Sequence, residues 1–67
     1  MTYYKLLDRV NRGTVVRAEG ENQQKHTAAR GWVDSGIMIQ YFCDESPVYD
    51  MYEEITKEEM QKLTGGE

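Results

Sequence analysis

Residues 51–63 read MYEEITKEEMQKL, and this stretch decides which kind of fold the chain can adopt. Thr56 and Glu59 have the spacing of a capping box, in which the threonine hydroxyl accepts a hydrogen bond from the N–H of residue 59. The glutamate carboxylate then accepts a bond from the N–H of residue 56. The pattern therefore predicts a helix over residues 57–63 that begins directly after a strand.

The side chains on either side of this cap predict which faces are buried. Met60 and Leu63 lie three residues apart, which places them on one stripe of the helix. The preceding residues alternate in polarity, which predicts a strand at about 51–55 with Met51 and Ile55 facing the core. The glycines that follow the helix predict a frayed tail over residues 64–67.

The N-terminal part of the chain predicts a meander of strands. Residues 3–10 and 14–19 are rich in β-branched and aromatic side chains, and the Asn11-Arg12-Gly13 sequence between them suits a hairpin loop with a bulge at the glycine. A second turn at residues 20–22 leads into residues 23–29, which are polar. Whether this third segment is a strand stays open; if it is, we expect an edge strand that exposes its polar side chains to water.

The middle of the chain is ambiguous. Trp32 and Val33 are expected to enter the core, and Asp34 or Ser35 is expected to cap a helix over residues 36–44. Spacings of four residues between apolar side chains favour this helix, whereas alternation of Ile37, Ile39, Tyr41 and Cys43 would fit a strand. The cap and the lack of a strand-type turn favour the helix.

Together these elements predict an α+β fold, with a small antiparallel sheet of a three-strand meander plus one later strand and two short helices on one face. At 67 residues the chain is expected to form one domain. Its single cysteine cannot form an internal disulfide, and a core this small leaves little net stability. Self-association, a binding partner or an unusually well-packed core would have to supply the missing stability.

The later half resembles a class of small uncharacterised bacterial proteins. The resemblance covers residues 30–63 and rests on the Trp32-Val33 pair, the apolar helix after it, and the run YEEITKEE at 52–59. It implies a β-meander, a helix, and a strand that leads into a capped helix. It further implies a bacterial or phage origin, and it implies no activity.

The residues offer little for catalysis. His26 and Cys43 are the only candidates for a nucleophile and its base, and Cys43 lies in an apolar stretch where a buried, inert thiol is expected. One cysteine and one histidine are too few for a structural zinc site. The glycines match no phosphate-binding loop. We therefore expect no enzyme, no cofactor, no metal, and no catalytic residue.

Charge divides the chain into two halves. Residues 1–30 carry six basic and three acidic side chains, a net charge of +3, and residues 31–67 carry two basic and nine acidic ones, a net charge of −7. The first hypothesis is a non-catalytic accessory or protein-interaction module of a bacterium or its mobile elements, which binds another protein or a second copy of itself. The alternative is a nucleic-acid-associated protein that uses the basic meander. The candidate partner surface for either consists of Tyr3, Arg9, Arg12, Arg17, Lys25 and Arg30.

The chain has no stretch of about 18 apolar residues that could span a bilayer, and its start lacks the apolar run of an export signal. The lone cysteine fits a reducing compartment. From these absences we expect a cytoplasmic location and no membrane partner.

Overall fold

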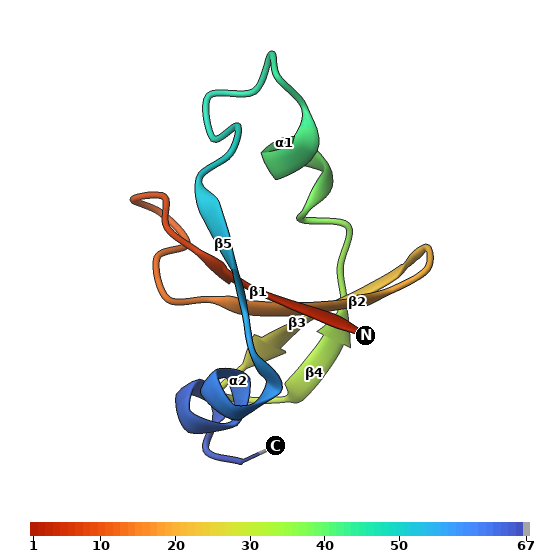
Figure 1. Ribbon diagram of the computed structural model, residues 1–67, viewed down its shortest axis with the longest axis vertical. Coiled ribbons are helices and arrows are strands. Elements are labelled where there is room, and N and C mark those ends of the chain that lie inside the picture. The colour runs from red at the N-terminus through yellow and green to blue at the C-terminus, as the bar shows by residue number, and fades with distance from the viewer. Residues whose placement is uncertain (67) are drawn as a thin grey trace.

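A five-stranded antiparallel sheet organises the protein, and the computed structural model describes residues 1–66 of it (Figure 1). The elements follow in the order β1 (Thr2–Leu6), β2 (Val15–Glu19), β3 (Asn22–Thr27), β4 (Gly31–Asp34), α1 (Ile39–Phe42), β5 (Tyr52–Ile55) and α2 (Lys57–Thr64). The strand order is β4-β3-β2-β1-β5, so the first four strands form a meander and β5 returns to pair with β1. The small antiparallel α+β sheet is thus confirmed.

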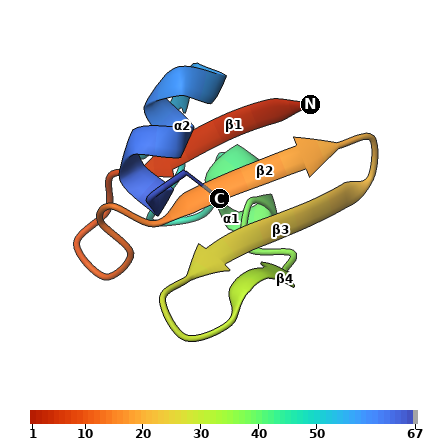
Figure 2. The same ribbon diagram turned by 90° about the horizontal axis from the view of Figure 1, so that it is seen from below.

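The two helices lie on opposite faces of the sheet, as Figures 1 and 2 show. Tyr3 pairs with Arg17 and with Ile55, which places these side chains on the face that α2 covers, called here the α2 face. Tyr4 pairs with Val16 on the other side, called here the α1 face. The prediction of two helices on one face is therefore wrong, because the strands bury apolar side chains on both sides.

The α2 face has a small regular core. Val15, Ile55 and Met60 are buried there, with Tyr3 and Trp32 packed against them. The predicted burial of Ile55 and Met60 is confirmed. The expected burial of Met51 and Leu63 is wrong, because they are 45% and 47% exposed. Trp32 packs against this core as expected, although its side chain is only half-buried.

Helix α2 begins as its sequence predicts. The Thr56 hydroxyl accepts a hydrogen bond from the Glu59 N–H at 3.1 Å, which satisfies one of the free N–H groups at the helix start. The Glu59 carboxylate instead lies 3.8 Å from the Lys5 ammonium, which also pairs with Glu53 at 2.9 Å. The hydrogen bond from the Glu59 N–H to the Thr56 hydroxyl is thus present, as the capping box predicts. The Glu59 carboxylate lies near Lys5 of strand β1 instead.

The end of α2 lies one residue beyond the predicted one. Thr64 is buried and its hydroxyl donates to the Met60 carbonyl, so this residue belongs to the helix and the frayed tail does not begin there. Gly65 ends the helix with a φ of 78°, a left-handed conformation that glycine adopts without strain. Residue 67 of the predicted tail lies outside the described residues.

The meander has one strand more than predicted. Trp32 and Val33 belong to β4, which pairs with β3, so β3 is an interior strand and its predicted edge position is wrong. Thr27 explains the tight return, because its side-chain oxygen accepts from the Arg30 N–H and donates to the Gly31 carbonyl. The open question about residues 23–29 is resolved in favour of a strand, at Asn22–Thr27.

Two predicted elements are shorter than expected. The strand predicted over 3–10 ends at Leu6. Beyond it, the Asp8 carboxylate accepts from the N–H of Asn11 and turns the chain. The helix predicted over 36–44 is a helix only at Ile39–Phe42. Its N-cap is Met38, with no side-chain hydrogen bond.

Candidate functional site

Helix α1 is the most unusual element, because only one side of this short helix is buried. Met38 at its N-cap and Tyr41 within it are fully buried against Leu6 and Val16 of the sheet. Ile39 is 75% exposed and Phe42 is 47% exposed. Three of the four residues of this helix are apolar or aromatic, and the sheet covers only one side of them.

A buried polar cluster holds α1 on the sheet. The Tyr41 hydroxyl donates to the Asp8 carboxylate, and the Asn11 side-chain amide donates to the Tyr41 oxygen at 3.1 Å. This bond from Tyr41 holds the pKa of the Asp8 carboxyl below its usual value, although burial acts in the opposite direction. Burial, and next the bond to Asp8, raise the pKa of the Tyr41 phenol. The loop after β1 and helix α1 are thus fixed to each other without a regular helix cap.

The ring of Phe42 is also fixed in place. It packs edge-on against Tyr4 and Tyr52, with ring centroids 5.9 Å and 5.4 Å away. These two tyrosines pack edge-on against each other at 5.4 Å. Such a cluster favours one ring orientation, so one side of Phe42 meets the sheet while the other faces water. Burial, and next the Glu54 charge, raise the pKa of the Tyr4 phenol.

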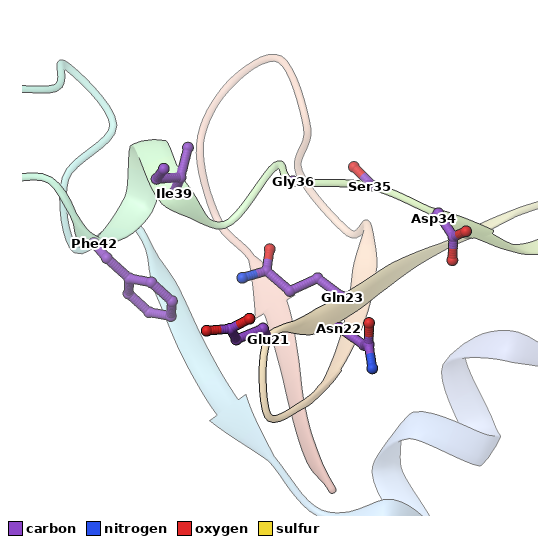
Figure 3. A pocket seen from close by; sticks show the side chains of 8 residues that line it. All are labelled: Glu21, Asn22, Gln23, Asp34, Ser35, Gly36, Ile39 and Phe42. Atoms are coloured by element: carbon purple, nitrogen blue, oxygen red, sulfur yellow. The ribbon is translucent and has the colours of Figure 1, made fainter.

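A groove lies between α1 and the turn that joins β2 to β3 (Figure 3). Its volume is about 490 Å³, and it is open to solvent along one side. We call it the α1 groove; its lining residues are Glu21, Asn22, Gln23, Asp34, Ser35, Gly36, Ile39 and Phe42. Two of them are acidic and none is basic, which gives the groove a negative, partly apolar character.

The β2–β3 turn presents Glu21 to this groove. Glu19 pairs with Asn22 across the turn, and Gly20 between them has a φ of 60°, a conformation that suits glycine in a two-residue hairpin loop. Glu21 is the next residue, and its carboxylate has no ion-pair or hydrogen-bond partner among residues 1–66. A tight turn therefore holds a free carboxylate at the groove.

Gln23, the second residue of β3, pairs with Ala18 and contributes a second polar side chain to the groove. Its side chain is half-buried, and its Oε1 atom is buried with no hydrogen-bond partner in the described part of the chain. An unpaired buried acceptor destabilises a protein by about 1–3 kcal/mol. One side chain that lines the groove thus has a buried oxygen without a hydrogen-bond partner among the described residues.

The six residues of the predicted partner surface do not form one patch. Tyr3 and Arg17 are register partners on the α2 face, whereas Lys25 pairs with Val16 and points to the α1 face. The other three, Arg9, Arg12 and Arg30, lie in the loop after β1 and in the turn before β4.

Arg17 already has partners within the sheet. Its Nε donates to the Gln24 side chain at 2.8 Å, and its guanidinium lies 4.2 Å from the centre of the Trp32 ring. Gln24 in turn donates to Asp34 at 3.1 Å. These contacts fix the side chains of the α2 face. They also engage the guanidinium of Arg17, one of the basic groups of the predicted partner surface.

The residues considered for catalysis also lie apart. His26 packs its ring edge-on against Trp32 on the α2 face, while Cys43 follows α1 on the other side of the sheet. Cys43 is exposed, so the expectation of a buried thiol is wrong, because the chain becomes extended directly after Phe42. Within residues 1–66, no three histidine, cysteine or acidic side chains lie close enough together to hold a metal ion.

The sequence interpretation missed the residues of the α1 groove, although a signal for it was present. Five of the six residues from Ile37 to Phe42 are apolar. A short helix can bury only one side, so a second apolar side indicates either a larger core or an exposed contact surface. Glu21 lies opposite the exposed side of α1 because of the register between β2 and β3, and local sequence patterns do not predict this register.

No helix in the described part of the chain is long and apolar enough to cross a membrane. Comparison of the sequence with family models and with curated proteins, and of the fold with solved structures, finds no match.

Proposed function

We propose that this domain is a non-catalytic protein-interaction module that binds a segment of another protein in the α1 groove. The observation that carries the proposal is the exposure of Ile39 and Phe42, 75% and 47%, on a helix whose other side is fully buried. Apolar and aromatic side chains that stay in water beside a concave surface are typical of contact sites. Because Phe42 is already held by two rings, little side-chain entropy is lost when a partner covers it.

Charge favours a foreign partner over a second copy of this chain. Glu21 and Asp34 line the groove, and the loop after α1 adds three further acids, Asp44, Glu45 and Asp50. Two copies that meet through this end would bring like charges together, which opposes association. A segment of opposite charge would be attracted instead.

Nucleic-acid binding has less support. The groove has no basic lining residue, and the basic residues of the meander are spread over both faces and two loops. A phosphate backbone requires a continuous positive surface. The dispersed arrangement offers none, so this alternative becomes an outcome of the test below.

The test is a selection of random displayed peptides on the immobilised protein, followed by binding measurements on the enriched peptides. We expect peptides that bind the wild-type protein saturably and lose at least about tenfold in affinity with Ile39→Ala plus Phe42→Ala, the range of contact residues worth more than about 1 kcal/mol. Leu63→Ala is the matched control, because Leu63 is also 47% exposed but lies on α2. The control should bind like the wild type.

Three results would overturn the proposal. The first is that the enriched peptides bind the α1 variants as tightly as the wild type. The second is that light scattering shows a dimer of the wild type that the α1 variants do not form. The third is that the protein binds single-stranded DNA in a salt-sensitive way while no peptide binds. If the double variant fails to fold, Ile39→Ala alone decides, because this side chain is 75% exposed and its loss removes little core packing.

A further inference from the structure

We infer that the α1 groove recognises an arginine side chain flanked by apolar residues in the partner segment. This inference rests on the proposed function and specifies the chemistry of the ligand. Three groups in the groove carry it, which are the carboxylate of Glu21, the side-chain amide of Gln23 and the ring of Phe42. Figure 3 shows that all three side chains border the same space.

Glu21 supplies the charge. Its carboxylate is exposed and unpaired within residues 1–66, so a cation can bind it without displacing an internal partner. Asp34 contributes differently, because its carboxylate accepts from Gln24 on the α2 face and adds negative potential only at the rim. Lys25, two residues along β3 from Gln23 on the same face, does not line the groove. The local potential therefore favours a positively charged group.

Phe42 and Ile39 supply the apolar surface. Arginine carries its charge on an aliphatic stem, and the stem can cover exposed apolar side chains while the guanidinium stays near a carboxylate. The Phe42 ring is a suitable stacking surface, because Tyr4 and Tyr52 hold its orientation from the other side. A small anion or a polar peptide would leave Ile39 and Phe42 uncovered.

Gln23 supplies an acceptor that is unpaired in the free protein. Its Oε1 atom is buried, so a ligand reaches it only if the amide turns about its terminal torsion. A half-turn exchanges the positions of the oxygen and the nitrogen, since the two groups have nearly the same shape. Binding of an N–H donor would draw the oxygen towards the groove and give this acceptor a partner, while the NH2 group takes the buried position.

Arginine fits these three groups better than lysine does. The guanidinium has five N–H donors in a plane, so it can donate to a carboxylate and an amide oxygen while its face lies on an aromatic ring. The lysine ammonium is more strongly hydrated and has no planar face. We therefore expect arginine to be preferred over lysine at this position.

The experiment is a titration of the ¹⁵N-labelled protein with a capped pentapeptide, in which one arginine is flanked by a leucine on each side and by terminal glycines. A second peptide replaces arginine with citrulline, which keeps the shape and the hydrogen-bond donors but lacks the charge. We expect the arginine peptide to shift the amide signals of residues 21–23 and 34–42 and the side-chain amide of Gln23. The citrulline peptide should bind about two- to fivefold more weakly, the range of an exposed ion pair.

Variants of single groups separate their contributions. Glu21→Gln should weaken the arginine peptide about fivefold and remove most of its advantage over citrulline. Gln23→Met should weaken both peptides while leaving the stability of the free protein equal or higher, because an unpaired acceptor is removed. Glu58→Gln is the matched control, since this carboxylate is exposed on α2, and it should leave binding unchanged.

The outcomes distinguish this inference from the proposed function. If arginine and citrulline peptides bind equally and both depend on Phe42, the groove binds apolar segments and the inference about arginine is wrong while the proposed function stands. If neither peptide shifts the groove signals and the display selection also yields no ligand that depends on α1, both are wrong. Equal loss of binding with Glu21→Gln and Glu58→Gln would show a general charge effect and overturn the assignment to the groove.

Discussion

The two faces of the sheet differ in how their helices are held. On the α2 face an eight-residue helix begins with a threonine cap, ends at a left-handed glycine and buries Met60 against Val15 and Ile55. On the α1 face a four-residue helix has no side-chain cap and depends on the cluster of Asp8, Asn11 and Tyr41. Local caps fix both ends of the first helix, whereas the second is held by side-chain hydrogen bonds between residues about 30 positions apart.

This difference is the reason why we propose a contact surface on the α1 face and not on the α2 face. A helix that satisfies its own ends can be regular and leave few apolar side chains without cover. Helix α1 is held by one buried tyrosine, so the loops on either side of it determine where its other side chains lie. Two of these side chains, Ile39 and Phe42, border the groove. The predictions below test whether the two faces depend on these separate contacts.

The largest effect is expected for Tyr41→Ala. Tyr41 is fully buried, and an aromatic-to-alanine change in a packed core destabilises a protein by about 3–5 kcal/mol. The change also removes the hydroxyl that donates to Asp8, which leaves a buried carboxylate with fewer donors. Chemical denaturation should show a loss in this range or no cooperative transition.

The comparison of the faces predicts where structure remains. If Tyr41→Ala keeps a folded remnant, the amide signals of α1 and of the loop after β1 should broaden first, while those of α2 persist. Loss of the α2 signals at the same denaturant concentration as those of α1 would contradict the separation of the two faces.

A smaller loss is expected for Trp32→Ala on the α2 face. Trp32 packs against the cluster of Val15, Ile55 and Met60 but is only half-buried, so we expect about 2–3 kcal/mol instead of the full range for a buried tryptophan. The Trp32 Nε1–H is buried without a hydrogen-bond partner among the described residues. Replacing Trp32 therefore also removes the free-energy cost of an unpaired buried donor. A loss of 4 kcal/mol or more in denaturation, on the order of a fully buried ring, would contradict this.

The Asp8 cluster makes the stability of the α1 face depend on pH. The pKa of Asp8 is lower in the folded protein than the value of about 3.9 in an unfolded chain, chiefly because the Tyr41 hydroxyl binds the ionised form. The unfolded state therefore binds a proton first, and the contribution of Asp8 is complete above that value and is lost as pH falls through the folded pKa. Denaturation from pH 7 to pH 2 should show a steeper loss for the wild type than for Asp8→Asn.

A matched acid on the other face serves as the comparison. Glu58→Gln removes an exposed carboxylate from α2, and its stability profile below pH 4 should remain close to that of the wild type. Parallel profiles for the wild type and Asp8→Asn would show that the buried bond to Tyr41 does not contribute.

The features predictable from sequence are those set by neighbours in the chain. The cap at Thr56 and the burial of Ile55 and Met60 depend on residues a few positions apart, and these predictions are confirmed. The antiparallel pairing of β1 with β2 is also confirmed, but the loop between them runs over residues 7–14 instead of the predicted Asn11-Arg12-Gly13. The side of the sheet that each helix covers was missed, because it depends on register. Val15 and Val16 are consecutive and both buried, so the sheet has two covered faces. Two consecutive valines interrupt the period-two alternation of the strand, so the sequence pattern does not assign one buried face to it.

The arrangement of residues around the α1 groove was missed for the same reason. The predicted surface grouped Tyr3, Arg17 and Lys25 by charge and aromaticity, whereas the register places Lys25 on the opposite face. Glu21 and Phe42 are 21 positions apart in the chain and border one groove only because β4 and the segment after it return along β3. Local sequence patterns describe helices and turns, but this groove is a product of tertiary arrangement.

The smallest effect is expected for Thr56→Ala, which tests the local character of α2. The change removes the side-chain acceptor for the Glu59 N–H, a bond of 3.1 Å, while the methyl group fits the same exposed site. Loss of a threonine N-cap costs about 1 kcal/mol, and we expect the midpoint of denaturation to fall with an unchanged slope. The amide signals of Lys57 to Glu59 should exchange faster, whereas those of Ile39 to Phe42 should exchange at wild-type rates after correction for global stability. Thr56→Ser keeps the acceptor and should restore most of the loss. If Thr56→Ala instead accelerates exchange in α1 as much as in α2, the helices are stabilised as one unit, and the groove beside α1 could not adjust to a partner independently of the α2 face.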